Sequence, residues 1–361
     1  MTLRASWLGV GLALAVLGSF QACAAGGGAT TGSAGEGGSF NPSGSSSAGG
    51  SGFECAIGTD EARLVPLNLY IMYDKSGSML GPKWTQSTAA LQAFFMDPTS
   101  AGLFVALRFF PDDGCDAGCN VGACAQPLVP LGELTALSAP TDVQEDLLIN
   151  AFVGKMPAGA TPLSAALDGA LQFTASVLDQ KPNERAAVVL VTDGDPSDCH
   201  LDEAYFVNQA GAAYAGRGIL TFAIGLEGSN PGLMNAIASA GGTGQGFFIG
   251  TGTFQDDLVA ALQTIRESAV ACEYQVPDQA DGFTVNPDEL NVLYTPSGGG
   301  SSTTIGQVPN LDACAAVSGG WYYDDPLDPT KIIFCPSTCA AVQGDLDAEI
   351  ELLFGCATIP A

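Results

Sequence analysis

Residues 186–192 read AAVVLVT, an uninterrupted apolar run that is rich in β-branched valine. A strand with no polar face is typical of a parallel sheet that is covered by helices on both sides. Parallel strands need long crossover connections, which are usually helices. The run therefore predicts an α/β fold in which further strands alternate with helices.

That alternation extends from residue 66 to residue 269. The two prolines of QPLVPL (126–131) confine this strand candidate to a sheet edge, because proline cannot donate a ladder hydrogen bond. Thr141 opens the capping box TDVQ, and Asn230 precedes Pro231 at a second helix start. We expect a doubly wound, mostly parallel sheet with helices on both faces. The other strand candidates are 67–73, 103–110, 219–225 and 246–250.

The pattern changes at Cys272. Short strand candidates such as LNVLYTP, GWYYDD and IELLFGC are separated by turn residues, and one helical signal lies at 337–343. This spacing predicts a small, cysteine-rich, β-sandwich-like domain at 272–361. The α/β domain is then assigned to 55–271.

The first 23 residues have the features of an export signal. Arg4 precedes an apolar run at 7–20 that is too short to span a bilayer comfortably, and the small residues of QACAA follow. Signal peptidase I would accept the sequence ACA at 22–24. The lipoprotein pathway would instead cut before Cys23 and acylate its sulfur, although the preceding residues FQ are atypical for that route.

Residues 24–54 are rich in Gly and Ser, and such a segment cannot bury a core. A lipid-anchored domain needs a flexible spacer of this kind, whereas a secreted soluble domain has little use for one. The spacer therefore favours acylation of Cys23. We expect an exported protein of the cell envelope, held at the outer membrane or on its periplasmic face by a lipid anchor alone.

The charge balance restricts the partners. The chain carries 38 acidic and 11 basic residues, for a formal net charge of −27. Nucleic acid and anionic membrane surfaces are excluded as partners, because they would be repelled at long range. This charge fits cations or basic partners, or a role in solubility alone.

Oxygen-bearing side chains follow two of the expected strands and precede one helix. DKSGSM places Asp74, Ser76 and Ser78 after the first strand, and TDGD places Asp193 after the AAVVLVT strand. Thr161 lies in GATPL, just before a helical pattern. Ligands of open α/β sheets bind at the carboxyl ends of the strands. Two carboxylates and three hydroxyls, without imidazole or thiolate, predict a site for Mg²⁺ or Mn²⁺.

The motifs DKSGSM, GATPLSAAL and VVLVTDG occur in the order typical of von Willebrand factor type A (VWA) domains, and the chain resembles that family. The resemblance implies a six-stranded sheet with one antiparallel edge strand and a metal-ion-dependent adhesion site (MIDAS). It also implies that Ser76, Ser78 and Thr161 contact the metal. Asp74 and Asp193 would act directly or through water, and a partner carboxylate would complete the shell. The Gly/Ser leader and the cysteine-rich tail are similar to Gram-negative envelope lipoproteins that carry one VWA domain.

Neighbouring residues are assigned to structural roles. Lys75, at the free position of the motif, is expected to face solvent, and so are Asp195 and Asp198. His200, the single histidine, is expected to be an ordinary loop residue. One histidine excludes a His-rich zinc site, and the chain has neither a nucleophile elbow nor a phosphate-binding loop. We therefore expect no enzyme activity.

The chain has eleven cysteines, and setting Cys23 aside leaves 11 − 1 = 10. An even number in an oxidising compartment favours disulfides over zinc. We expect two bridges among the four cysteines near the metal edge, and a Cys55–Cys272 bridge that joins the two ends of the α/β domain. The candidate disulfide cysteines are Cys55, Cys115, Cys119, Cys124, Cys199, Cys272, Cys314, Cys335, Cys339 and Cys356.

Three functions fit these observations. The first is a metal-dependent protein-binding or adhesion module of the envelope, whose partner presents an acidic side chain to the metal. The second is a structural subunit of an envelope complex, in which the metal only stabilises the fold. The third is a non-catalytic partner of an enzyme, and the export signal disfavours the intracellular form of that role.

Overall fold

The computed structural model describes residues 58–250, 254–270, 272–277, 279–280, 283–284, 286–297, 300–343, 345 and 348–361. The expected signal peptide, the Gly/Ser-rich linker, Cys23 and Cys55 lie outside these residues. Among the described residues, no helix is both long enough and apolar enough to cross a membrane.

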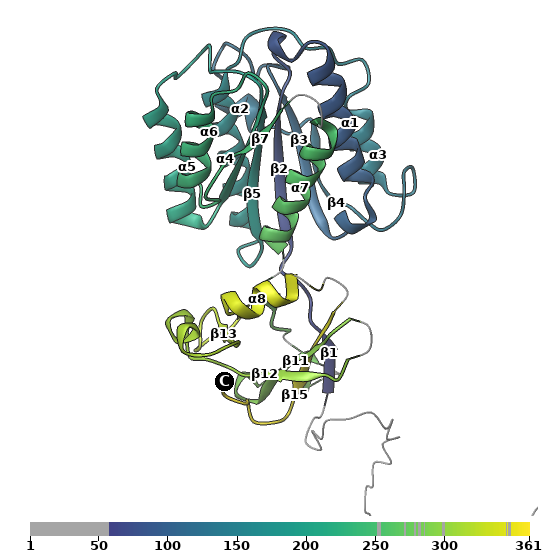
Figure 1. Cartoon of the computed structure of the whole chain (residues 1–361), viewed down its shortest axis with the longest axis vertical. Helices are drawn as coiled ribbons and strands as arrows, with labels where there is room; N and C mark the ends of the chain where they lie inside the picture. The colour runs from purple at the N-terminus through teal and green to yellow at the C-terminus, as the bar shows by residue number, and fades with distance from the viewer. Residues whose placement is uncertain are drawn as a thin grey trace, which may run out of the picture. The chain divides into compact units, whose positions relative to one another are not determined.

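A six-stranded sheet forms the centre of the α/β domain (Figure 1). Its order is β4-β3-β2-β5-β6-β7. Neighbouring strands are parallel except β4, which pairs antiparallel with β3 through a register shift. The expected fold, with an antiparallel strand at the proline-marked edge, is therefore confirmed. The strands are β2 (Leu67–Asp74), β3 (Leu103–Phe110), β4 (Val129–Glu133), β5 (Arg185–Thr192), β6 (Leu220–Leu226) and β7 (Phe247–Ile249).

Helices cover both faces of this sheet (Figure 1). Alternate residues of β5 face opposite sides, so Val189 and Val191 lie in one core and Val188 and Leu190 in the other. The first core includes α1 (Pro82–Met96), α3 (Val143–Asn150) and α7 (Phe254–Val270). The second includes α2 (Val121–Cys124), α4 (Leu163–Gln180), α5 (Glu203–Arg217) and α6 (Pro231–Ala240).

Side-chain caps define the starts of several helices. Asn230 caps α6 by accepting a hydrogen bond from the backbone N–H of Leu233, as expected. The start of α3 differs from the expected capping box, because Asp142 and not Thr141 is the N-cap residue. The Asp142 carboxylate accepts the backbone N–H of Glu145 at 2.9 Å, and a charged acceptor satisfies that position strongly.

A second domain consists of two antiparallel sheets that share one core. The first sheet has the order β1-β15-β11-β12 and the second β13-β14-β8. Trp321, Phe334, Val292 and Leu352 meet in the common core, so the sandwich-like arrangement is as expected. The expected helix is also present as α8 (Pro336–Gln343). The strands are β1 (Gly58–Glu61), β8 (Glu273–Gln275), β11 (Leu290–Thr295), β12 (Thr303–Ile305), β13 (Trp321–Tyr323), β14 (Lys331–Phe334) and β15 (Glu349–Phe354). A separate two-stranded hairpin pairs β9 (Gln279–Ala280) with β10 (Phe283–Thr284).

The expected start of the α/β domain at residue 55 needs correction. β1 pairs antiparallel with β15 across Gly58↔Phe354 to Glu61↔Glu351, so residues 58–61 belong to the second domain. Backbone hydrogen bonds are what join this strand to the sheet, and its sequence GTDE has no apolar alternation that could have predicted it.

The expected Cys55–Cys272 bridge is wrong. Cys272 is bonded to Cys339, with Cα atoms 5.2 Å apart. The carbonyl oxygen of Cys272 accepts the backbone N–H of Phe334, and this antiparallel pairing brings Cys272 next to the start of α8. Cys314 is bonded to Cys335 in the same domain. All nine cysteines in the part of the chain that the structure describes are disulfide-bonded.

Candidate metal centre

Asp74 is the last residue of β2, and the chain turns sharply after it. The backbone N–H of Ser76 donates to Asp74 Oδ1 at 2.7 Å. The short 3₁₀ helix Gly77–Met79 follows, and the N–H of Gly77 donates to the carbonyl of Gly159 at 3.0 Å. This contact holds the first motif against the loop that leads to α4. Asp74 and Ser76 are both buried.

A chain of side-chain hydrogen bonds connects the first motif to the end of β5. The hydroxyls of Ser76 and Ser78 are 2.9 Å apart, and the Ser78 hydroxyl donates to Asp193 Oδ1 at 2.7 Å. Asp193 is buried and directly follows β5. The adjacent parallel strands β2 and β5 therefore bring these predicted residues together.

Thr161 reaches the same place from the loop before α4. Its backbone N–H donates to Ser197 Oγ at 2.8 Å, and the N–H of Ser197 donates to the Thr161 carbonyl at 3.1 Å. A Cβ atom built on Gly194 would lie 3.6 Å from Ser78 Oγ and 3.8 Å from Thr161 Oγ1. The two hydroxyls thus converge beside Gly194, and all five predicted residues lie at one edge of the sheet.

The two carboxylates of the cluster are both buried, which makes their negative charge costly. Burial raises the pKa of Asp74 to about 6, although hydrogen bonds from Thr192 Oγ1 and from Ser76 oppose this shift. Lys83 forms an ion pair with Asp193 Oδ2. One ammonium group cannot balance two carboxylates.

The donor set fits a hard divalent cation. Two carboxylates and three neutral hydroxyls are oxygen ligands of the kind that Mg²⁺ and Mn²⁺ take. Among the described residues, no group of three or more His, Cys, Asp or Glu side chains could hold a metal, so the structure offers no competing zinc-type cluster there. The metal assignment itself stays a prediction.

The environment of Lys75 differs from the expectation. This side chain was expected to face solvent, but the residue is buried, with its Nζ 3.5 Å from Asp112 Oδ1. Its backbone N–H donates to the Phe110 carbonyl, and its carbonyl accepts the N–H of Ala158. These bonds confine Lys75 between the end of β3 and the loop before α4. Asp112 also pairs with Lys155.

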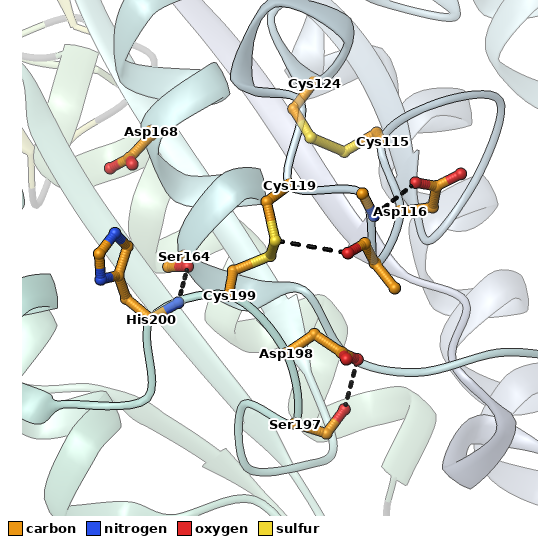
Figure 2. The surroundings of a disulfide bond; sticks show 12 residues. Cys115, Asp116, Cys119, Cys124, Ser164, Asp168, Ser197, Asp198, Cys199 and His200 are labelled. Atoms are coloured by element: carbon orange, nitrogen blue, oxygen red, sulfur yellow. Dashed lines mark hydrogen bonds between the residues drawn. A yellow bond between two sulfur atoms is a disulfide. The ribbon is translucent and has the colours of Figure 1, made fainter.

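Three residues of the loop after β5 were expected to be ordinary or solvated loop residues, and the structure agrees. Asp195 is exposed and Asp198 is partly exposed. His200 is exposed, and its ring stacks on Tyr205 with centroids 3.9 Å apart. The backbone N–H of His200 donates to Ser164 Oγ (Figure 2). His200 therefore stabilises the loop and is not part of the hydroxyl–carboxylate cluster.

Two disulfides anchor the loops at this edge, as expected for the four cysteines concerned. Cys115 is bonded to Cys124, and Cys119 is bonded to Cys199 (Figure 2). The second bridge joins the loop after β3 to the loop that carries Asp193. Cys119 and Cys199 both have positive φ angles, 56° and 69°, which few non-glycine residues adopt.

Three residues at the site were not predicted. Thr192 donates to Asp74, Ser197 holds the backbone of Thr161, and Lys83 holds Asp193. Thr192 had a usable signal, since its hydroxyl directly precedes Asp193 at the end of a buried strand. Ser197 and Lys83 had none, because their partners are distant in the sequence.

Neither a protein-family profile nor a curated protein matches the chain. A similar solved structure is proximal thread matrix protein 1 from the mussel byssus with a zinc-occupied MIDAS motif, at 17% identity over 60% of this chain and 50% of that chain, with a TM-score of 0.41. Another is the vWF domain of the type V pili tip protein Mfa5 from Porphyromonas gingivalis, at 13% identity over 60% of this chain and 99% of that chain, with a TM-score of 0.38. A third is the manganese-loaded TRAP protein of Plasmodium vivax, at 17% identity over 77% and 96% of the two chains, with a TM-score of 0.38. The chain thus spans about half the length of the mussel protein.

Proposed function

We propose that this protein is a non-catalytic, metal-dependent protein-binding module of the cell envelope. The observation that carries the proposal is the convergence of three hydroxyls and two buried carboxylates at the carboxyl edge of the sheet. The metal would be Mg²⁺ or Mn²⁺. It would supply a positive centre that accepts a carboxylate oxygen from a partner.

The residues of the chain set how strongly such a cation would attract a further anion. Ser76, Ser78 and Thr161 would hold it through neutral oxygens, which leave its charge uncancelled. Asp74 is engaged by Thr192 and Ser76, and Asp193 by Ser78 and Lys83. Because both carboxylates are partly satisfied by the protein, a partner carboxylate would be favoured as an additional ligand.

The three loops that carry the cluster also expose large apolar side chains. Leu80 is 59% exposed after the first motif, Met156 is 70% exposed before Thr161, and Leu201 is 59% exposed in the loop after Asp193. Exposed apolar patches that are rimmed by polar residues are typical of interaction sites. They support a partner segment in which an acidic side chain is flanked by apolar residues.

The envelope location is carried by the sequence alone. The export signal, Cys23 and the Gly/Ser-rich linker support a lipid-anchored domain that stands off its membrane. With a net charge of −27, the protein would repel a generally acidic partner, so the partner's acidic group would lie on a neutral or basic surface.

A structural role is the second candidate, and one observation favours it. Asp74 is fully buried and bonded to Thr192, so the cluster also ties β2 to β5. In that role the metal would stabilise the fold without meeting a ligand.

A pull-down from envelope extracts separates these two roles. The protein would be presented with Mg²⁺, with chelator, and as a Leu201→Ser variant that leaves the cluster intact. Loss of the same partner with chelator and with the variant, at unchanged melting temperature of the variant, supports adhesion through this edge. Partner capture that neither treatment affects, together with a chelator-dependent melting temperature, supports the structural role.

A further inference from the structure

Lys83 is the second residue of α1, and its side chain reaches across to the end of β5. Its ammonium group donates to Asp193 Oδ2 and lies 3.3 Å from the carbonyl oxygen of Glu227, which follows β6. Asp193 Oδ1 accepts the Ser78 hydroxyl at the same time. The side chain of Asp193 is fully buried, and that of Lys83 is 23% exposed.

This ion pair places a positive charge directly beside the hydroxyl–carboxylate cluster. A buried carboxylate gains substantially from a partner, and removing the partner leaves an uncompensated charge. An incoming divalent cation would therefore have to share Asp193 with an ammonium group that is already held there. The ammonium group and a cation bound to the same carboxylate would repel each other, even where solvent screens their charges.

We infer that Lys83 is an internal counter-ion of the site, which lowers the affinity for divalent cations by competing for Asp193. This inference rests on the proposed metal site. A lowered affinity makes the metal exchangeable. The binding of the metal and of a partner carboxylate would be coupled, so the factor by which the metal strengthens partner binding equals the factor by which the partner strengthens metal binding.

Calorimetric titration with Mn²⁺ tests the competition. The Lys83→Met variant should bind Mn²⁺ about five- to tenfold more tightly than the unaltered protein, because one positive charge is removed beside the cation. Lys181→Met is the matched control. It removes the same charge from the loop after α4, where Lys181 pairs with Glu184, and should leave the affinity unchanged. Equal or weaker binding by Lys83→Met would overturn the inference.

A double-mutant cycle locates the effect. The Asp193→Asn substitution removes the carboxylate for which Lys83 and the cation compete. In that background, Lys83→Met should therefore increase the affinity for Mn²⁺ by a smaller factor than it does in the unaltered protein. The same gain in both backgrounds would show that Lys83 acts through general charge, and would reject competition for Asp193.

The melting temperature is a second readout, for the case that Mn²⁺ binds too weakly for calorimetry or that Lys83→Met folds poorly. Lys83→Gln keeps a side chain that can donate to Asp193 while it removes the charge. Without metal this variant should melt at a lower temperature than the unaltered protein, and Mn²⁺ should raise its melting temperature by more. If neither protein responds to millimolar Mn²⁺ in either assay, the metal site itself is rejected. If both respond equally, only the role of Lys83 is rejected.

Discussion

The Thr192 hydroxyl donates to Asp74 Oδ2 at 2.6 Å, so the last residue of β5 is bonded to the last residue of β2. The two strands are parallel neighbours, paired up to Tyr73↔Val191. This bond satisfies one oxygen of a fully buried carboxylate. It also fixes the orientation of Asp74 before any cation binds.

We therefore expect Thr192→Val to destabilise the protein. The substitution keeps the shape of the side chain but leaves Asp74 Oδ2 without its donor, at a cost of roughly 1–3 kcal/mol. Urea unfolding in the presence of chelator measures this loss. Thr192→Ser retains the hydroxyl and lacks only the methyl group, so it should lose less stability than Thr192→Val. A Thr192→Val variant as stable as the unaltered protein would contradict a contribution of this hydrogen bond.

Metal binding should depend on the clustered oxygens and not on nearby exposed ones. Asp74→Ala and Ser76→Ala should each abolish the dominant Mg²⁺ or Mn²⁺ site in calorimetry, because each removes a donor of a small cluster. Asp195→Ala removes an exposed carboxylate from the same edge and should leave binding intact. Undiminished binding in both of the first two variants would contradict the assignment.

The two disulfides at this edge should differ in their contribution to stability. Cys119–Cys199 spans 80 residues of sequence and Cys115–Cys124 spans 9. In the chain-entropy model, loops of these lengths contribute about 4.5 and about 2.5 kcal/mol. Replacing each pair by serine and measuring urea unfolding should therefore show the larger loss for Cys119–Cys199. Peptide mapping that finds other pairings would remove the basis of this comparison.

The N-cap of α3 should give stability that depends on pH. Burial raises the pKa of Asp142, but hydrogen bonds from Glu145 and Thr135 outweigh it, so the pKa lies below its usual range. A lowered folded-state pKa contributes stability above the unfolded pKa, near 3.9, and this contribution is lost as the pH falls through the folded pKa.

Asp142→Asn should thus cost about 1 kcal/mol at pH 7, and the difference from the unaltered protein should shrink at pH 3. Thermal unfolding at the two pH values measures it. Asp146→Asn removes the same charge from the first turn of the same helix and leaves the bonds to Thr135 in place. If the two variants behave alike at both pH values, the hydrogen bonds of Asp142 are not the cause.

Acylation of Cys23 remains a prediction from the sequence. Mass spectrometry of the mature amino terminus should show a lipid-modified Cys23, because a flexible spacer follows it. A terminus that begins at Ala25 would show cleavage by signal peptidase I and would remove the proposed anchor.

The sequence by itself determined the α/β architecture and the place of the cluster. Buried strands such as 186–192 are apolar throughout, so their position in a parallel sheet is a local property of the chain. The prolines of 126–131 identified the edge strand for an equally local reason. Asp74 ends β2 and Asp193 directly follows the neighbouring strand β5, so parallel pairing brings both to one edge.

Only the tertiary structure decided which distant groups complete that edge. Lys83 contacts Asp193 and Lys75 contacts Asp112. In each pair the long lysine side chain reaches a carboxylate that is distant in the sequence, so no local motif indicates the contact. β1 joins β15 through backbone hydrogen bonds, which any residue except proline can make. The antiparallel pairing of β8 with β14 brings Cys272 and Cys339 together, with their Cα atoms 5.2 Å apart. The spacing of the cysteines in the sequence does not predict this pairing.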